Sequence, residues 1–162
     1  MPGVAVPVPP NRRPARGTPE DPIWGAGVIV WRPAAAGPEF LLLRNALHRT
    51  WGFAKGHMDR EDDDLEQTAL RELAEETGLR LRPTDLLPGF ADVSSYRPGR
   101  RWKRVVLFLA RLPDGAEILP SEEHDRFGWF GSEAALERLH HQELKRSLIR
   151  AVWRLGLESP AR

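Results

Sequence analysis

Apolar residues after Pro22 gather in short runs rich in β-branched and aromatic side chains, and turns with proline and glycine separate these runs. Runs of this length and composition are typical of strands. The pattern predicts strands at residues 23–31 (IWGAGVIVW), 39–44 (EFLLLR), 50–54 (TWGFA), near 90–93, at 103–111 and at 126–130, with a polar loop at 97–101.

Helical patterns alternate with these runs. Residues 63–77 predict a helix, and Gly78 follows it as a C-terminal cap. Ser132 predicts the cap of a second helix that begins near Glu133, and a last helix is expected at about 142–155. Strands mixed with a few helices, without an internal repeat, predict a layered α/β sandwich.

The composition limits the class of protein. The 162 residues suffice for one domain with a sizeable core, and 41% apolar with 29% charged residues is typical of globular proteins. A net charge of only +1 provides no field to hold a polyanion, so we expect no stable binding to nucleic acid. Because there is no cysteine, any metal must bind to oxygen or imidazole.

Residues 1–22 differ from the rest of the chain. They hold seven of the 15 prolines and three arginines, and they lack a periodic apolar pattern. We interpret 1–22 as a flexible Pro/Arg-rich tail and 23–158 as the folded domain. A basic arm that binds nucleic acid is the alternative, which three arginines support only weakly.

Two short apolar stretches bear on location. The run at 23–31 is far shorter than the ~20 residues that a membrane span needs. The stretch at 4–8 is broken by proline and lacks the hydrophobic region of a secretory signal. We therefore expect no membrane association and a cytoplasmic location.

The most informative segment is the predicted helix within GHMDREDDDLEQTALRELAEETGL. Glu72, Glu75 and Glu76 stand at i, i+3 and i+4, so their carboxylates share one helix face. Like charges held this close raise one another's pKa unless a cation is shared between them. Mg²⁺ fits such a site, and Mn²⁺ is possible, because both prefer oxygen ligands.

A solvated glutamate face, with Arg71 paired to Glu75, is the simpler interpretation of this spacing. Leu70, Leu73 and Thr77 lie on the adjoining sector, however, so the carboxylates border the buried side of the helix. The pattern RELAEETGL is also specific, since chance would produce it in about one in a hundred thousand chains of this length.

The segment resembles the Nudix box, whose pattern is G-x5-E-x7-R-E-U-x-E-E-x-G-U with U apolar. Residues 71–79 match every specified position, whereas the interval from Gly56 to Arg71 is one residue too long. Counting eight residues back from Arg71 reaches Asp63, where the family has glutamate. We expect the extra residue in the acidic loop between Gly56 and Asp63.

The resemblance implies the Nudix fold, an α/β/α sandwich with a mixed β-sheet. It also implies an enzyme in which water attacks a phosphorus of a nucleoside diphosphate linked to another group. As metal ligands it implies Gly56, Glu75 and Glu76, with Glu72 as ligand or general base and Asp63 as ligand or helix-start partner.

Segments outside the box resemble the asymmetric diadenosine tetraphosphate hydrolases of this family. WGFAKGH is similar to their W-x-x-P-K-G-H pattern, with Ala54 in place of proline. Tyr96 precedes Lys103 and the strand KRVVLFLA, as in the animal enzymes of this type. SEEHDRFGWF resembles their histidine-glutamate-histidine segment, and EAALERLHHQELKRSLIRA their C-terminal helices.

These segments supply candidate substrate-binding residues. Lys55 and Lys103 can bind internal phosphates, and His57 can donate a hydrogen bond to phosphate. Tyr96 offers a stacking platform for adenine, with Phe127 as a second wall or, equally, a core residue.

The segment 121–130 supplies two further candidates. By its resemblance, Glu123 is preferred over Glu122 as the remote carboxylate that completes the metal site or holds the water. His124 is a candidate phosphate contact, with an exposed loop histidine as the alternative.

The substrate expected is a small nucleotide, with hydrolysis of diadenosine tetraphosphate to ATP and AMP as the leading hypothesis. Diphosphoinositol polyphosphates are an alternative, for which arginines in 97–104 provide a basic surface. Capped RNA and nucleoside triphosphates also stay open, because loops set base recognition. A non-catalytic nucleotide sensor is disfavoured by the intact Glu72, Glu75 and Glu76. The sequence leaves the oligomeric state open.

Overall fold

A computed structural model describes residue 6 and residues 14–158. Its helices and strands follow the chain as β1 (Ile23–Arg32), β2 (Glu39–Asn45), β3 (Trp51–Gly52), β4 (Ala54–His57), α1 (Leu65–Thr77), a 3-10 turn η1 (Pro83–Asp85), β5 (Asp92–Tyr96), β6 (Lys103–Arg111), β7 (His124–Gly131), α2 (Ser132–Arg138) and α3 (Gln142–Glu158).

Strand β1 is the centre of one mixed sheet. It pairs in parallel with β6 from Ile23 opposite Lys103 to Trp31 opposite Arg111. On its other edge β1 pairs antiparallel first with β4 and then with β2. The order through the sheet is β3-β2-β1-β6-β5, with β7 added to β2. The parallel pair explains why β1 and β6 are almost continuously apolar, since both of their faces are covered.

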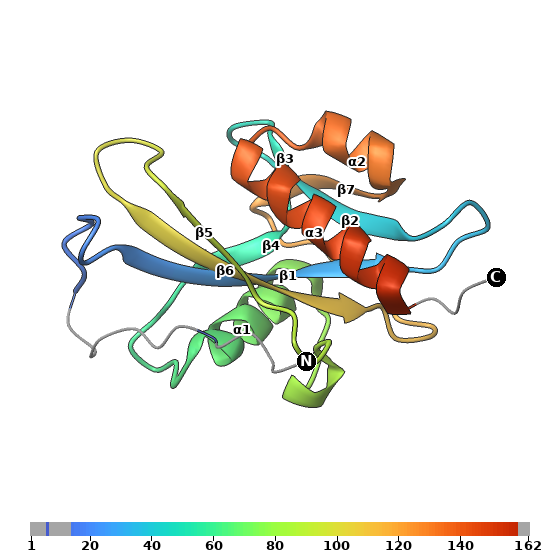
Figure 1. Ribbon diagram of the computed structural model, residues 1–162, viewed down its shortest axis with the longest axis horizontal. Coiled ribbons are helices and arrows are strands. Elements are labelled where there is room, and N and C mark those ends of the chain that lie inside the picture. Colours follow the sequence, from blue (N-terminus) through green and yellow to red (C-terminus); the bar gives the residue numbers. More distant parts are fainter. Residues whose placement is uncertain (1–5, 7–13, 159–162) are drawn as a thin grey trace.

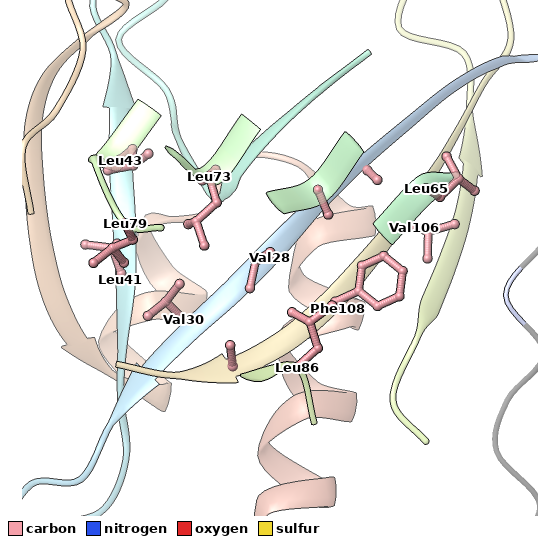
Figure 2. Close-up of a cluster of buried hydrophobic side chains, with 14 residues drawn as sticks. Val28, Val30, Leu41, Leu43, Leu65, Leu73, Leu79, Leu86, Val106 and Phe108 are labelled. Carbon is pink, nitrogen blue, oxygen red and sulfur yellow. The ribbon is translucent and has the colours of Figure 1, made fainter. Parts of the chain in front are cut away.

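Helices cover both faces of the sheet, with α1 on one side and α2 and α3 on the other (Figure 1). Because side chains alternate across a strand, Val28 and Val30 of β1 point toward α1 and join the cluster around Leu73 (Figure 2). Ile29 points the other way and packs in the second cluster with Leu148 of α3. The predicted α/β/α sandwich with a mixed sheet is confirmed.

The predicted and observed elements differ in a few places. The run at 50–54 is two short strands separated at Phe53, and residues after Ala54 continue as β4 up to His57. Strand β5 spans Asp92–Tyr96 and so lies further along than the predicted 90–93. Alternation of polar and apolar side chains is weak in this stretch, so its register was not readable.

Within the predicted tail, the structure describes residue 6 and residues 14–22. The backbone of 14–22 is tied to the β5–β6 connection, since the N–H of Trp102 donates to the carbonyl of Gly17 at 2.7 Å and the N–H of Ile23 donates to the carbonyl of Trp102 at 2.9 Å. The remainder of the predicted tail lies outside the described residues. Across 14–158, no helix combines the length and apolar character that a bilayer span requires.

Candidate active site

Helix α1 carries the three box carboxylates, and its two ends are fixed by caps. Asp64 accepts a hydrogen bond from the N–H of Gln67 at 2.7 Å, and Gly78 ends the helix in the left-handed conformation with φ 76°. Leu65, Ala69 and Leu73 bury one stripe of the helix against the sheet. This stripe turns Glu72 and Glu76 toward β4.

Close approach between α1 and β4 depends on Gly56. A Cβ atom at this position would lie 2.2 Å from the carboxyl carbon of Glu72, so only glycine leaves room for that carboxylate. Gly27 of β1 similarly faces the carbonyl of Ala54, which a Cβ would approach to 2.2 Å. Two glycines thus let β4 lie between the carboxylates and the central strand.

Glu76 is the most buried of the three carboxylates, with 6% of the residue exposed. Its Oε2 accepts a hydrogen bond from the backbone N–H of Lys55 at 2.8 Å. Burial, followed by the nearby charge of Glu72, raises the pKa of Glu76 to about 8. Burial also raises the pKa of Glu72, although Arg71 opposes the shift. The protein itself therefore does not fully compensate the charge of the two carboxylates when both are ionised.

Glu123 and His124 approach the same place from the start of β7. One ligand atom from each of Glu76, Glu123 and His124 lies within 4.8 Å of the others. The N–H of Ala46 donates to the carbonyl of Glu123 at 2.8 Å, and the N–H of Ser121 donates to the carbonyl of Glu76 at 3.2 Å. Backbone bonds on both sides thus bring the remote carboxylate, predicted from sequence, next to the box.

The donors in this group fit a divalent cation. Buried carboxylates with raised pKa values are stabilised when a cation is shared between them. Glu76 and Glu123 supply hard oxygen ligands, and the carboxylate of Glu72 lies against the backbone of Gly56. A cation at this site would neutralise the developing charge of a reacting phosphate and lower the pKa of a bound water.

Cationic side chains lie beside the carboxylates. Lys55 and His57 lie on β4 and Lys103 begins β6, on the two sides of β1. Burial, followed by the charges of Lys103 and Lys55, lowers the pKa of His57. Burial lowers the pKa of Lys55, and the charge of Glu76 partly restores it. Through the alternation along β4, the side chains of Lys55 and His57 point to the α3 side of the sheet, beside β6. Carboxylates and basic side chains therefore meet around one four-residue strand.

A NUDIX domain model matches residues 21–152 of this chain. The chain belongs to the NUDIX family. It is 38% identical over 113 residues to the asymmetrical bis(5'-nucleosyl)-tetraphosphatase of Mus musculus, covering 68% of this chain and 76% of the relative. The enzyme of the same name from Caenorhabditis elegans is 29% identical over 126 residues, covering 77% and 90%.

The fold agrees with a solved structure of that second enzyme. The crystal structure of a C. elegans Ap4A hydrolase binary complex has a TM-score of 0.72 and 26% sequence identity, and the match covers 83% of this chain and 98% of that chain. The Nudix fold predicted from the box is thereby confirmed.

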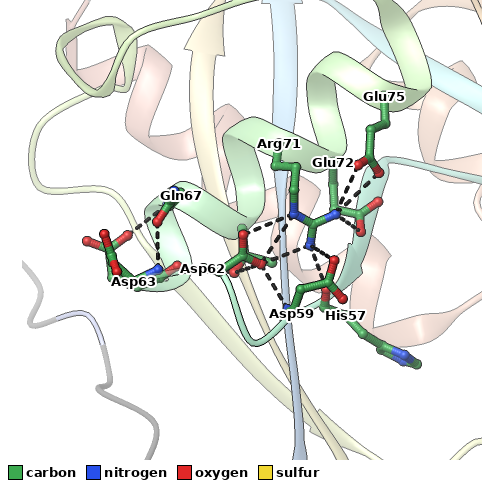
Figure 3. Close-up of polar contacts among 10 residues, drawn as sticks. His57, Asp59, Asp62, Asp63, Gln67, Arg71, Glu72 and Glu75 are labelled. Atoms are coloured by element: carbon green, nitrogen blue, oxygen red, sulfur yellow. Dashed lines mark hydrogen bonds and ion pairs between the residues drawn. The ribbon is translucent and has the colours of Figure 1, made fainter. Parts of the chain in front are cut away.

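The N-terminal half of the Nudix box has a different register from the predicted one. Asp62, not Asp63, lies against Arg71, whose Nε and second terminal nitrogen donate to it at 3.0 and 2.9 Å (Figure 3). The spacing from Gly56 to Asp62 is G-x5-D, which matches the family pattern with aspartate for glutamate. The extra residue therefore falls between Asp62 and Arg71, at the start of α1.

Asp63 does not lie with the other carboxylates. It precedes the cap of α1, and Glu76 is 12 residues beyond that cap, a rise of about 18 Å along the helix. At that separation Asp63 and Glu76 cannot share one ion, and at the helix start the backbone N–H of Asp63 donates to Oε1 of Gln67 at 2.6 Å. Asp64 makes the capping hydrogen bond expected of a helix-start partner.

Glu75 pairs with Arg71 at the surface of α1. Its side chain is 57% exposed and accepts from Arg71 at 3.2 Å, the i,i+4 pair that its spacing predicts. It is not in the group of Glu76, Glu123 and His124. The three glutamates of the box thus have different surroundings, although they share one helix face.

The two predicted stacking residues lie on opposite faces of the sheet. Tyr96 packs with the α3-side cluster, and burial raises its pKa. Phe127 is 41% exposed and pairs with Leu43, whose side chain belongs to the α1-side cluster. Directly opposite residues share a face, so Phe127 does not face Tyr96 across one pocket.

Two residues near the site had no predicted role. His141, just before α3, lies close enough to Lys55 for that charge to lower its pKa, after the larger effects of burial and His140. Asp62 is the buried partner of Arg71. The spacing from Gly56 was a readable signal for Asp62, whereas no local pattern marked His141.

Proposed function

We propose that this protein is a Nudix pyrophosphohydrolase that cleaves diadenosine tetraphosphate, or a close dinucleoside polyphosphate, to ATP and AMP. The observation that carries the proposal is the meeting of two opposite sets of charge around β4. Glu72 and Glu76 lie against the backbone of β4, with Glu123 beside Glu76. The side chains of Lys55 and Lys103 lie on the α3 side of the sheet. A polyphosphate chain with a bound cation requires both sets.

The residues of the chain divide the work of hydrolysis. Glu76 and Glu123 hold the ion, with Mg²⁺ as the proposed cofactor and Mn²⁺ as an alternative. When bound, the ion supplies charge neutralisation and an activated water. Glu72, whose side chain is only 14% exposed and whose pKa is raised by burial, accepts the proton of the attacking water. Glu75 serves as a ligand only if it leaves Arg71.

Recognition of the substrate falls to the α3 side of the sheet. Lys55 and Lys103 bind internal phosphates as compact charges, and His57 donates a hydrogen bond to a phosphate oxygen. Tyr96 is the stacking platform for a base. His124 remains a candidate phosphate contact, and Phe127 is the weakest candidate because of its face. The substrate is thus a small molecule, and we further propose a cytoplasmic location.

The names of the relatives support this substrate. The relatives from Mus musculus and Caenorhabditis elegans are both named asymmetrical bis(5'-nucleosyl)-tetraphosphatases. The match to this chain covers 76% and 90% of their lengths. Intact Glu72 and Glu76 argue against a non-catalytic nucleotide sensor. Diphosphoinositol polyphosphates are the second candidate, favoured by the exposed Arg97, Arg100 and Arg101 in the β5–β6 connection.

The test is a substrate panel with Mg²⁺. The purified protein is incubated with dinucleoside polyphosphates, inositol pyrophosphates, nucleotide sugars and nucleoside triphosphates, and products are separated by ion exchange. We expect ATP and AMP in equal amounts from diadenosine tetraphosphate, and reaction in ¹⁸O-labelled water identifies the phosphorus attacked. Preference for inositol pyrophosphates would overturn the substrate, and no cleavage of any diphosphate linkage would overturn the enzyme.

A further inference from the structure

One imidazole lies within the carboxylate group of this site. Ligand atoms from Glu76, Glu123 and His124 all lie within 4.8 Å of one another, and these residues come from the end of α1 and the start of β7. A divalent ion with ligands at about 2.0–2.2 Å brings its donor atoms to comparable separations. The position of His124 is therefore that of a donor to the same ion.

The imidazole is also short of a polar partner. His124 Nδ1 is buried, and among the described residues it has no hydrogen-bond partner; Ser121 Oγ beside it is in the same condition. Buried nitrogen atoms in native proteins nearly always have a partner, so an exception points to a ligand or another function. This observation is independent of the spacing between the three side chains.

The backbone of His124 is held on both sides. Its N–H donates to the carbonyl of Ser121 at 3.1 Å, and a shift in the β2–β7 register occurs where Asn45 pairs with His124. Next to it, Asp125 accepts two hydrogen bonds from Arg44 at 2.9 and 2.8 Å and one from Arg49 at 2.7 Å. These contacts fix the backbone that carries the imidazole.

We propose that His124 is a ligand of the divalent ion held by Glu76 and Glu123, which makes the site a mixed oxygen and nitrogen site. The proposal rests on the metal site of the proposed function and deepens it. Imidazole binds Mn²⁺ and later transition metals more readily than Mg²⁺, which prefers oxygen and water. His124 thus raises the affinity of the site for Mn²⁺ relative to Mg²⁺, a different role from contacting phosphate.

The direct test is pulsed electron paramagnetic resonance of the purified full chain with Mn²⁺ and no substrate. Coordination by imidazole gives a ¹⁴N modulation in the electron spin echo. We expect this modulation in the unchanged protein and its loss in His124→Gln. A Mn²⁺ complex without ¹⁴N modulation in the unchanged protein, or no Mn²⁺ binding at all, overturns the proposal, even if His124→Gln fails to fold.

Calorimetric titration supplies the second readout. His124→Gln should weaken Mn²⁺ binding by about tenfold or more, as loss of a ligand contact does, and Mg²⁺ binding much less. The ratio of the two affinities should fall accordingly. Equal weakening of both ions would mean that His124 only supports the fold of the site, and the ligand role would be rejected.

Two other histidines serve as controls. His57→Gln removes an imidazole near the site, and His48→Gln removes one from the β2–β3 connection; both variants should retain the ¹⁴N modulation. Loss of the ¹⁴N modulation in His57→Gln would identify His57 as the source of the nitrogen and would contradict the proposal. Failure of the proposed function is separable, because a ¹⁴N-coupled Mn²⁺ site in a protein that cleaves no diphosphate linkage would uphold His124 while rejecting the enzyme.

Discussion

Two buried carboxylates at neighbouring places along α1 differ in how many partners the protein gives them. Around Arg71, the carboxylate of Asp62 is only 2% exposed and is fully engaged by the guanidinium, by the N–H of Asp59 and by the hydroxyl of Thr68. One turn further on, Glu76 is nearly as buried, but within the described part of the chain its carboxylate accepts a hydrogen bond from a single N–H, that of Lys55.

The consequence is seen in the pKa values of the two carboxyls. Burial alone would raise the pKa of Asp62, but the hydrogen bonds from Arg71, Asp59 and Thr68 outweigh burial and lower it. The pKa of Glu76 is raised to about 8 because burial and Glu72 dominate. The charge of Asp62 is compensated by Arg71 within the protein. The charge of ionised Glu76 is left for a bound cation to compensate.

The largest effect should come from removing the charge that faces the ion. Glu76→Gln should lower kcat by about 10³-fold or more, because a metal ligand is lost while the side chain keeps its shape. Hydrolysis of diadenosine tetraphosphate with saturating Mg²⁺ measures this. Circular dichroism should show an unchanged fold, and near-normal turnover would contradict the ligand role.

The paired region should respond in stability instead. Arg71→Met leaves Asp62 buried without its cation, which should cost about 3–5 kcal/mol in the free energy of unfolding. Urea denaturation measures the loss. The double variant with Asp62→Asn should recover part of it, since the two side chains form one network. A loss no larger than that of an exposed ion pair would mean that the network contributes little.

The unpaired region predicts how stability depends on pH. The pKa of Glu76 rises from the ordinary value of 4.5 to about 8, so its protonated form favours the folded state. That contribution is complete below pH 4.5 and is lost as pH rises through about 8. With a chelator present, the melting temperature should therefore fall over this range.

A divalent salt should reverse the trend, because the ion binds the ionised carboxylates of the folded state. Thermal melts at pH 5.5 and pH 8, each with EDTA or with about 5 mM Mg²⁺, compare the metal-free and metal-bound protein. In Glu76→Gln the difference between the two pH values should shrink. A chelator-treated protein that is more stable at pH 8 than at pH 5.5 would contradict the charge imbalance.

The smallest effect is expected at the border between the two regions. Glu75 is 57% exposed and pairs with Arg71, so Glu75→Gln should change kcat by about tenfold at most and stability by less than about 1 kcal/mol. The same kinetic assay and denaturation curves apply. A loss as large as that of Glu76→Gln would show that Glu75 leaves Arg71 to bind an ion.

The sequence predicted the features that depend on local spacing. Glu72, Glu75 and Glu76 share a helix face because the period of a helix dictates it, and Gly78 ends the helix because it accepts a positive φ. The apolar runs at 23–31 and 103–111 predicted two strands, but their parallel pairing at the centre of the sheet came only from the structure. The carboxylate chemistry therefore followed from one segment.

Features that depend on contacts between different segments could not be predicted from the sequence. The choice between Asp62 and Asp63 depends on which carboxylate reaches Arg71 around the start of α1, and counting back from Arg71 selected the wrong one. The opposite faces of Tyr96 and Phe127 follow from strand pairing and alternation, which composition does not fix. His141 reaches the site only through the packing of α3.

Strand β4 links the expected ion site to the basic side chains beside it, so the binding of an ion and the binding of a nucleotide should be coupled. The backbone N–H of Lys55 binds the carboxylate of Glu76, while the side chain of the same residue lies with Lys103 on the other face. An ion bound by Glu76 would therefore act on Lys55, the residue that we propose binds the phosphates of the substrate. By thermodynamic reciprocity, whatever the ion adds to the affinity for the nucleotide, the nucleotide adds to the affinity for the ion.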